Sequence, residues 1–333
     1  MTHYLVTGGV GFIGSHLVKA LLGRSARVTV VDRRSLDQSP ILQAACKGTD
    51  FRFIQADLRD SDNTAELLAA SKPDVVYHLA AQPLSILSNI APLNTAQDNI
   101  FGTYSVLEAV RNHSPRSRLV YTSSACFYGV PTSAPPLRET HAPAVGHYMY
   151  TATKIAADFA VQHYRHIYDL RCVSVRMVNV YGPGDTNLGR VVPRIVMQAL
   201  RGEAPTLTQS DGNDVFSFLY MDDAVAALEL LGMHPSAIQK PVWNIAGSAP
   251  LSVLELMRRI YSLVGRPTDS FAAIGPRRGA PVHKYLDGTM IREELGFSPA
   301  IDLDGGLRST IEWYRRYLSA VSGGQVEVQG ARA

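Results

Sequence analysis

The stretch "LVTGGVGFIGSHL" (residues 5–17) places three glycines, Gly8, Gly11 and Gly14, between an apolar run and an amphipathic run. Glycines let the chain turn tightly from a strand into a helix. They also let the backbone approach a pyrophosphate, which the free N–H groups and the dipole of the helix N-terminus attract. The pattern is informative because it follows a predicted strand and opens a predicted helix. We therefore predict a dinucleotide-binding turn here.

Strand-like apolar runs alternate with helix-like amphipathic runs through the first two-thirds of the chain. This alternation is typical of a parallel sheet covered on both faces, and it predicts an α/β, doubly wound Rossmann fold. The predicted strands are 4–8, 27–32, 51–57, 75–81, 119–124, 172–180 and 241–247. The predicted helices are 14–23, 61–71, 92–112, 148–168, 190–202, a segment from 222, 252–265 and 302–318.

The pattern changes after "YGPGDTN", and this change sets the predicted domain boundaries. We assign residues 1–180 to an NAD-binding Rossmann domain, to which 220–247 return. Residues 181–219 and 248–318 form a smaller, discontinuous C-terminal lobe that binds the substrate. The last segment, 319–333, is expected to be a flexible tail.

The bulk composition predicts an ordered globular enzyme. Hydrophobic residues make up 46% and charged residues 18%, and the net charge of +3 is scattered, which argues against a nucleic-acid partner. Three widely spaced cysteines argue against a disulfide framework and favour a reducing compartment. No metal-ligand spacing, signal peptide or membrane-length apolar run is found, so we expect a cytoplasmic protein without a metal site or a membrane partner.

Acidic residues end the second and third predicted strands. Asp32 stands where a carboxylate accepts hydrogen bonds from the hydroxyls of an adenosine ribose, and its charge repels the extra phosphate of NADP. We therefore predict NAD as the cofactor, although Arg33 beside it weakens the argument. Asp57 is expected to meet the adenine edge, with the ordinary reading of an acid in a turn left open.

A tyrosine and a lysine stand one helical turn apart in "YMYTATK" (148–154). Tyr150 and Lys154 share one face of a predicted helix, and Ser124 ends a predicted strand upstream. A free phenol, with a pKa of about 10, is a poor base at neutral pH. A lysine ammonium together with a cationic nicotinamide ring would stabilise the phenolate, which predicts an activated Tyr150.

The motifs "TGGVGFIG", "HLAA", "DNIFGT", "SSACFYG", "YTATK" and "VNVYGPGD" occur in the order and spacing of the extended short-chain dehydrogenase/reductase family. The chain resembles the NAD-dependent nucleotide-sugar epimerase/dehydratase branch over roughly residues 3 to 318. The resemblance implies NAD as cofactor, a nucleotide-diphosphate sugar as substrate and a homodimer formed through 92–112 and 148–168.

The resemblance also implies residue roles. Tyr150 is the base that takes a sugar hydroxyl proton, Ser124 hydrogen-bonds the same oxygen, and Lys154 tunes Tyr150. Asn99 supports the backbone of the active site, and Asn179 contacts the substrate diphosphate. Ala80 and Ala81 match the loop that runs along the cofactor, and Ser85 joins the substrate residues. The remaining predicted cofactor residues are Phe12, Ile13, Leu58 and Leu79.

Cys126 stands two positions after Ser124, so both side chains are expected to face the sugar. The string "SSAC" resembles GDP-mannose 3,5-epimerases, whose cysteine deprotonates carbons next to a 4-keto group. The lysine that those enzymes carry after the "YGP" turn is missing, and only Arg190 is near. The acidic pair of many 4,6-dehydratases is replaced by Ala125 and Cys126. Cys126 is therefore either a carbon acid/base or a small packing residue.

The substrate lobe departs from the family pattern as well. Phe216 and Ser217 replace an Arg-Asp pair whose arginine clamps the diphosphate. Arg277 and Arg190 are the predicted substitutes, and a solvated surface role stays open for both. His147 lies close enough in sequence to Tyr150 to reach the site, but a surface role is an equal alternative.

These features predict an NAD-dependent nucleotide-sugar epimerase that works through a transient 4-keto hexose, at carbon 4 or at carbons 3 and 5. A dehydratase that uses Cys126 as acid/base is the first alternative. An NAD(P)-dependent keto-sugar reductase is the second. A catalytically silent NAD-binding sensor is the most remote.

Overall fold

Seven parallel strands form the central sheet of the computed structural model, which describes residues 1–131, 136–208, 210–274 and 281–322. The spatial order is β3-β2-β1-β4-β5-β6-β11, so the chain reverses direction across the sheet between β1 and β4. In such sheets ligands bind at the carboxyl ends of the strands, beside the reversal. The strands are β1 (His3–Thr7), β2 (Arg27–Asp32), β3 (Phe51–Gln55), β4 (Val75–His78), β5 (Arg118–Thr122), β6 (Cys172–Met177) and β11 (Val242–Ile245).

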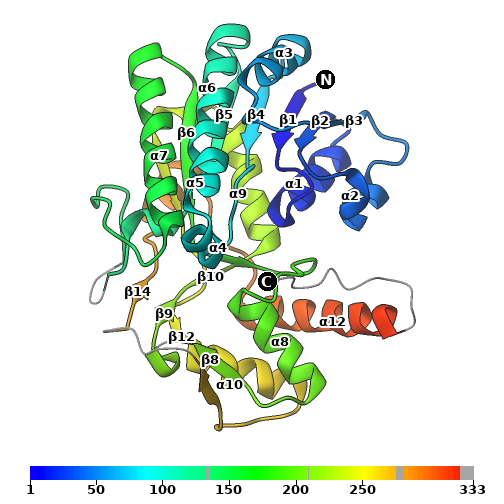
Figure 1. Ribbon diagram of the computed structural model, residues 1–333, viewed down its shortest axis with the longest axis vertical. Helices are drawn as coiled ribbons and strands as arrows, with labels where there is room; N and C mark the ends of the chain where they lie inside the picture. The colour runs from blue at the N-terminus through cyan, green and yellow to red at the C-terminus, as the bar shows by residue number, and fades with distance from the viewer. Residues whose placement is uncertain (132–135, 209, 275–280, 323–333) are drawn as a thin grey trace.

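Helices cover both faces of this sheet (Figure 1). On one face, α1 (Phe12–Gly23) and α9 (Met221–Met233) pack in a core with alternate strand residues. On the other, α3 (Ser61–Ser71), α6 (Gly102–His113) and α7 (Met149–Tyr168) form a second core. Burial on both faces explains the unbroken Val/Ile-rich strands and confirms the predicted doubly wound fold.

A smaller lobe follows β7 (Asn179–Tyr181) and lies at the carboxyl ends of the strands, below the sheet in Figure 1. Its core joins the apolar faces of α8 (Val191–Arg201), α10 (Val253–Val264) and α12 (Leu303–Ser322). The strands around that core are short: β8 (Thr206–Thr208), β9 (Val215–Phe216), β10 (Phe218–Tyr220), β12 (Leu251–Ser252), β13 (Ala272–Ile274) and β14 (His283–Lys284). β14 runs parallel to β9.

Local signals explain several helix boundaries in the lobe. Ser252 and Glu255 form a reciprocal capping box at the start of α10, and Gly265 ends that helix with a left-handed φ of 86°. The helix predicted over 252–265 is thereby confirmed to within a residue at each end. Gly202 ends α8 in the same way, with a φ of 73°.

Some elements differ from the predicted ones. The helix predicted over 92–112 is divided into α5 (Pro92–Ala96), a π-helical turn at Gln97–Phe101 and α6. α12 continues to Ser322 and so includes residues 319–322 of the predicted flexible tail; residues 323–333 lie outside the description. Three short helices were not predicted: α2 (Pro40–Ala45), α4 (Ser85–Ile90) and α11 (Thr289–Leu295). Within the part of the chain that the structure describes, no helix combines the length and apolar character of a membrane span.

Candidate active site

The glycine turn between β1 and α1 is closely packed. Gly8 has a left-handed φ of 72°, and a Cβ there would lie 2.6 Å from the Ala80 backbone nitrogen. A Cβ on Gly14 would lie 2.2 Å from the carbonyl oxygen of Gly8. Only glycine fits these two positions, so the turn presents bare backbone and the first N–H groups of α1, at Phe12 and Ile13, to a ligand. This arrangement fits the pyrophosphate of a dinucleotide.

The segment after β4 lies against that turn. The Leu79 N–H donates to the Thr7 carbonyl oxygen (3.1 Å), and the Ala80 N–H donates to the Thr7 hydroxyl (3.3 Å). His78 continues the connection, because its Nδ1 lies 2.7 Å from the same hydroxyl. The structure thus brings Leu79 and Ala80, both predicted to line the cofactor, to the glycine turn, and Ala81 follows them in the chain.

His78 was not predicted as part of the site. Its ring is buried between Thr7 and Thr103, with Nε2 3.1 Å from the Thr103 hydroxyl. Burial, aided by the Lys154 charge, lowers the pKa of His78 to about 3. A ring that stays neutral at physiological pH serves here as a hydrogen-bonding strut between β1 and α6, not as a proton donor.

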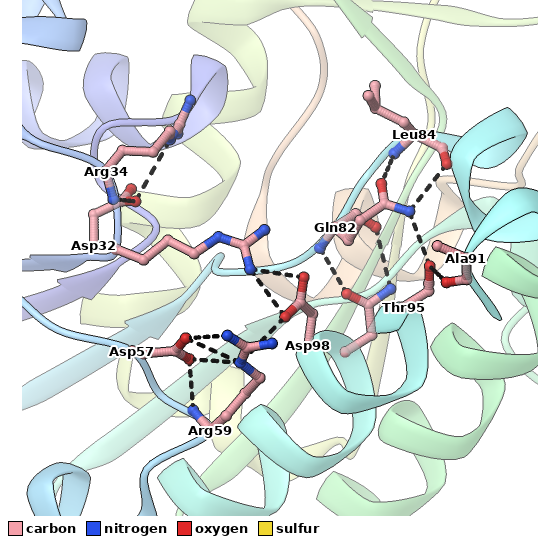
Figure 2. A network of polar contacts seen from close by, with 11 residues as sticks. Asp32, Arg34, Asp57, Arg59, Gln82, Leu84, Ala91, Thr95 and Asp98 are labelled. Atoms are coloured by element: carbon pink, nitrogen blue, oxygen red, sulfur yellow. Dashed lines mark hydrogen bonds and ion pairs between the residues drawn. The ribbon is translucent and has the colours of Figure 1, made fainter. Parts of the chain in front are cut away.

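Asp32 lies at the carboxyl end of β2, facing the glycine turn. Its carboxylate accepts hydrogen bonds from the Val10 N–H and the Arg34 N–H, both at 3.0 Å, and it is 7% exposed. Figure 2 shows the contact with Arg34. The carboxylate is therefore fixed beside the pyrophosphate turn, which is where a ribose-binding acid is needed. Its ribose contact remains a prediction.

Arg33 and Asp57 belong to a charged network beside β2 and β3. Figure 2 labels its members Asp57, Arg59 and Asp98. Arg33 pairs with Asp98 at 2.9 Å, and Arg59 pairs with Asp57 at 2.5 Å and reaches Asp98 at 3.7 Å. The hydrogen bonds from Arg59 lower the pKa of Asp57. The two predicted cofactor residues are thus already paired with protein charges, and Leu58 between Asp57 and Arg59 packs under α6.

Asn99 is buried in the π-helical turn before α6. Its side-chain oxygen accepts from the Gln82 N–H at 2.7 Å, and its amide donates to the Gln82 carbonyl and to the Thr153 hydroxyl. Figure 2 shows Gln82 reaching on to Thr95 and Leu84. Asn99 therefore ties the segment after β4 to α7, which agrees with a supporting role for the backbone.

The short helix α4 positions the start of α7. The Tyr150 N–H donates to the Ser88 hydroxyl at 2.9 Å, and the Met149 N–H donates to the Asn89 side chain at 2.8 Å. Ser85 opens α4, and its carbonyl accepts the Ser88 hydroxyl. The predicted substrate residue Ser85 is thus near the catalytic helix, and Ser88 is a positioning residue that the sequence did not reveal.

Lys154 is buried beneath Tyr150, with only 4% of its surface exposed. Its ammonium donates to the Thr122 carbonyl at 2.8 Å and to the Tyr121 hydroxyl at 3.2 Å. It lies 6.0 Å from the centre of the Tyr150 ring. Burial lowers the pKa of Lys154 to about 8, against a smaller opposing effect of the Asp158 carboxylate.

The protein alone does not lower the pKa of Tyr150. Burial raises it above its ordinary value and the Cys126 side chain adds to the rise, whereas a hydrogen bond with Ser124 and the charge of Arg190 act in the opposite direction. The Lys154 ammonium, 6.0 Å from the centre of the ring, does not outweigh the effect of burial. The expected activation of Tyr150 therefore depends on the second part of that prediction, a cationic ring of the cofactor.

Cys126 lies in a 3₁₀ turn directly after Ser124 and is half-buried. The Ser124 hydroxyl accepts the Cys126 N–H at 3.1 Å. The Cys126 sulfur faces an unexpected partner: Lys284 of β14, whose ammonium lies 3.8 Å away. Sequence analysis found no lysine near the "YGP" turn, and the lysine that the structure supplies comes from a strand of only two residues.

The predicted substrate residues occupy different positions. Arg190 precedes α8, pairs with Asp185 at 3.0 Å and lies 5.5 Å over the Phe12 ring, so it reaches the start of α1. Asn179 opens β7 with an exposed side chain. Arg277 lies outside the described residues. His147 is exposed, and its carbonyl oxygen accepts the Asn89 amide at 3.3 Å.

A glycine turn that admits a pyrophosphate and a Ser–Tyr–Lys set at the same sheet edge define an extended short-chain dehydrogenase/reductase. A family model confirms this over residues 4–246: the chain belongs to the NAD dependent epimerase/dehydratase family. NAD is accordingly the cofactor, and the structure holds the turn that fits it.

The chain is similar both to epimerases and to dehydratases of that family. It is 35% identical to a UDP-glucose 4-epimerase of Mycolicibacterium smegmatis, over 93% of this chain and 98% of that protein. It is 31% identical to a dTDP-glucose 4,6-dehydratase of Streptomyces griseus, over 96% and 95%. The solved dTDP-glucose 4,6-dehydratase DesIV of Streptomyces venezuelae, with NAD bound, superposes with a TM-score of 0.85 at 27% identity, covering 96% of this chain and 98% of DesIV.

Proposed function

We propose that this chain is an NAD-dependent nucleotide-sugar epimerase that oxidises carbon 4 of the hexose transiently. One arrangement carries the proposal: the Ser124 side chain acts on the Tyr150 phenol and lowers its pKa against the larger effect of burial, and the buried ammonium of Lys154 lies 6.0 Å from the centre of the Tyr150 ring. Two hydroxyls that converge in this way hold a single substrate oxygen and move its proton. The similarity to a UDP-glucose 4-epimerase supports the reading.

Each residue of the set has a distinct task in this proposal. Tyr150 accepts the proton of the sugar hydroxyl, and Ser124 donates a hydrogen bond to the same oxygen. Lys154 holds its ammonium near the phenol and keeps Thr122 and Tyr121 in place. Bound NAD would supply the acceptor for the hydride of carbon 4 and the source from which that hydride is returned. The glycine turn and Asp32 would hold the cofactor, as predicted.

Arg190 is the proposed contact to the substrate diphosphate. It stands where the lobe meets the start of α1, and its charge acts on Tyr150. Phe216 and Ser217, which replace the family's Arg-Asp pair, lie in or beside β9 and bring no charge. The guanidinium of Arg190, just before α8, therefore takes over part of the missing clamp.

The dehydratase reading rests on an equally direct similarity, to the dTDP-glucose 4,6-dehydratase. Against it, the acidic pair is absent: Ala125 is buried and Cys126 is a thiol. A keto-sugar reductase would exchange its cofactor with solution at every turnover, whereas an epimerase or a dehydratase would keep its cofactor bound. These differences make the readings separable in one assay.

The test is turnover of UDP-, GDP-, CDP- and dTDP-hexoses by the purified protein, followed by NMR of the products. We expect an epimer formed without added cofactor, and a loss of about 10²–10⁴-fold in kcat for Tyr150→Phe. Tyr317→Phe, on α12 and away from the site, is the matched control and should keep full activity. Bound NAD with no turnover of any sugar would contradict the proposal and favour the silent sensor.

We also propose a homodimer through the face of α6 and α7. Large hydrophobic side chains are exposed on α6 (Tyr104), on the turn just before it (Phe101) and on α7 (Phe159, Ile167 and Tyr168). Exposed hydrophobic side chains on two neighbouring helices are typical of a protein interface. Light scattering should give twice the mass of the chain for the wild type and the monomer mass for Phe101→Asp/Ile167→Asp; a monomeric wild type contradicts the proposal.

A further inference from the structure

Two arginines, Arg33 and Arg34, directly follow Asp32, the predicted ribose-binding acid. An acid at the end of the second strand favours NAD, whereas an arginine nearby accommodates the 2′-phosphate of NADP. The chain carries both signals in adjacent positions. The partners of the arginine side chains therefore determine whether the site offers a positive charge to a phosphate.

Arg33 is anchored both by its backbone and by its side chain. The Arg33 carbonyl oxygen accepts the Gln55 amide at 3.1 Å, which ties it to the end of β3. Its Nη1 donates to one oxygen of the Asp98 carboxylate at 3.0 Å and lies 2.9 Å from the other. The Asp98 side chain is only 11% exposed, so the carboxylate lies largely inside the protein and draws the guanidinium towards it.

Asp98 belongs to the π-helical turn at Gln97–Phe101, a kind of turn that is frequent at functional sites. The neighbouring Asn99 bonds to the segment after β4 through Gln82. Asp98 instead bonds to residues that follow β2 and β3, and its contact with Arg59, at 3.7 Å, is visible in Figure 2. The turn thus places a carboxylate against the arginine that follows the ribose-binding acid.

The charged groups around this end of the sheet balance one another. Three guanidiniums are paired with three carboxylates: Arg33 with Asp98, Arg34 with Asp32 and Arg59 with Asp57. A 2′-phosphate beside Asp32 would add a negative charge of about 1.5 to 2. It would gain a guanidinium only by taking one from a carboxylate that is already paired.

We infer that Asp98 is a specificity-determining residue, which excludes NADP by holding Arg33 away from the 2′ position of the adenosine ribose. Asp98 acts through Arg33 and is therefore a positioning residue. NAD carries only a hydroxyl at that position and requires no guanidinium, so the ion pair stays intact when NAD binds. The inference concerns the cofactor alone and is independent of the sugar reaction under "Proposed function".

The test is titration calorimetry of the nucleotide-free protein with NAD and with NADP. Asp98→Asn should bind NADP about 10-fold more tightly than wild type, because the released guanidinium makes a charge-assisted hydrogen bond to the phosphate. Its affinity for NAD should change by less than about 3-fold. Asp98→Glu keeps the carboxylate and should keep the wild-type ratio of the two dissociation constants. An unchanged ratio in Asp98→Asn overturns the inference.

Asp50→Asn is the matched control. Asp50 pairs with Arg27 at 2.9 Å, at the opposite end of the same strand β2. The substitution removes the same charge from an arginine–carboxylate pair that is remote from the ribose. It should therefore bind both nucleotides like wild type, and a gain in NADP affinity equal to that of Asp98→Asn would overturn the inference.

Two double variants separate the release of Arg33 from the mere loss of a negative charge. Arg33→Met/Asp98→Asn should show no gain in NADP affinity over Arg33→Met. Arg34→Met/Asp98→Asn should keep the full gain over Arg34→Met, because Asp98 holds Arg33 and not Arg34. A gain that persists without Arg33 would come from weaker repulsion alone and overturns the inference.

Arg33→Met gives a readout that does not require an Asp98 variant to fold. In about 1 M salt, which screens charges that are not in contact, its ratio of NADP to NAD affinity should stay within about 3-fold of wild type. The reason is that Arg33 does not reach the phosphate while Asp98 holds it. A larger loss of NADP affinity would show that Arg33 binds the 2′-phosphate in the presence of Asp98, which overturns the inference.

Discussion

The cofactor side and the sugar side of the active site are held in different ways. On the cofactor side, long parallel strands and buried polar residues such as Asn99 and His78 fix the backbone. On the sugar side, Arg190 stands just before a helix and Lys284 ends a strand of two residues. Binding of NAD requires a rigid backbone on the cofactor side. Selection of the substrate and of the reaction depends on side chains, which stand on elements that tolerate changes of sequence.

The largest expected effect on stability comes from a buried ion pair on the cofactor side. Arg176 of β6 and Asp158 of α7 pair at 3.0 Å with 2% and 0% of their side chains exposed, and the Arg176 guanidinium lies 3.4 Å over the Phe127 ring. Asp158→Asn leaves a buried, unpaired guanidinium, so we expect a loss of about 3–5 kcal/mol in the free energy of unfolding. Urea denaturation measures the loss.

The matched pair lies in the lobe. Arg258 and Asp269 meet at 2.9 Å with 48% and 87% of their side chains exposed, so Asp269→Asn should leave stability unchanged. The double change Asp158→Leu/Arg176→Met should recover most of the stability lost in Asp158→Asn, because it removes the isolated charge. Equal effects of the two single substitutions would contradict the distinction between the two sides.

The next largest expected effect is the pH dependence of stability that Lys154 causes. Its folded pKa of about 8 lies below its ordinary value of 10.5, so the unfolded chain binds more protons between these two pH values. Stability relative to Lys154→Met should therefore rise as pH increases from 8 to 10.5, by about 3 kcal/mol. Below pH 8 the difference should stay constant. Urea denaturation of both proteins at pH 7 and pH 10 measures it.

Activity should change in the opposite sense over the same range. The ammonium of Lys154 is lost as pH rises through about 8, so kcat/KM should fall above that pH. A profile that stays flat to pH 10 would show that the ammonium is not required. The same burial that costs stability near neutral pH thus keeps a titratable group beside Tyr150.

The residues of the cofactor side could be predicted from the sequence because their motifs are local. The glycine turn, the acid that ends β2 and the one-turn spacing of Tyr150 and Lys154 can each be recognised within a few residues. Lys284 could not be found in this way, since a two-residue strand has no periodicity and its position depends on pairing with β9. Ser88 escaped for a similar reason: the six-residue helix that carries it has no amphipathic repeat.

Removal of a helix N-cap is expected to have the smallest effect on stability, and it can be compared between the two parts of the molecule. Asp60 caps α3 on the Rossmann side through the Asn63 N–H (3.0 Å), and Ser252 caps α10 in the lobe through the Glu255 N–H (3.1 Å). Each substitution to Ala should cost about 1 kcal/mol. If the lobe opens separately from the sheet, Ser252→Ala should speed amide exchange in α8, α10 and α12 and leave the central strands protected. Asp60→Ala should leave exchange in those three lobe helices unchanged. Equally faster amide exchange throughout the chain in both variants would mean that the two parts unfold as one unit. The greater tolerance of the sugar side to sequence change would then be a property of its side chains alone and not of a separately opening backbone.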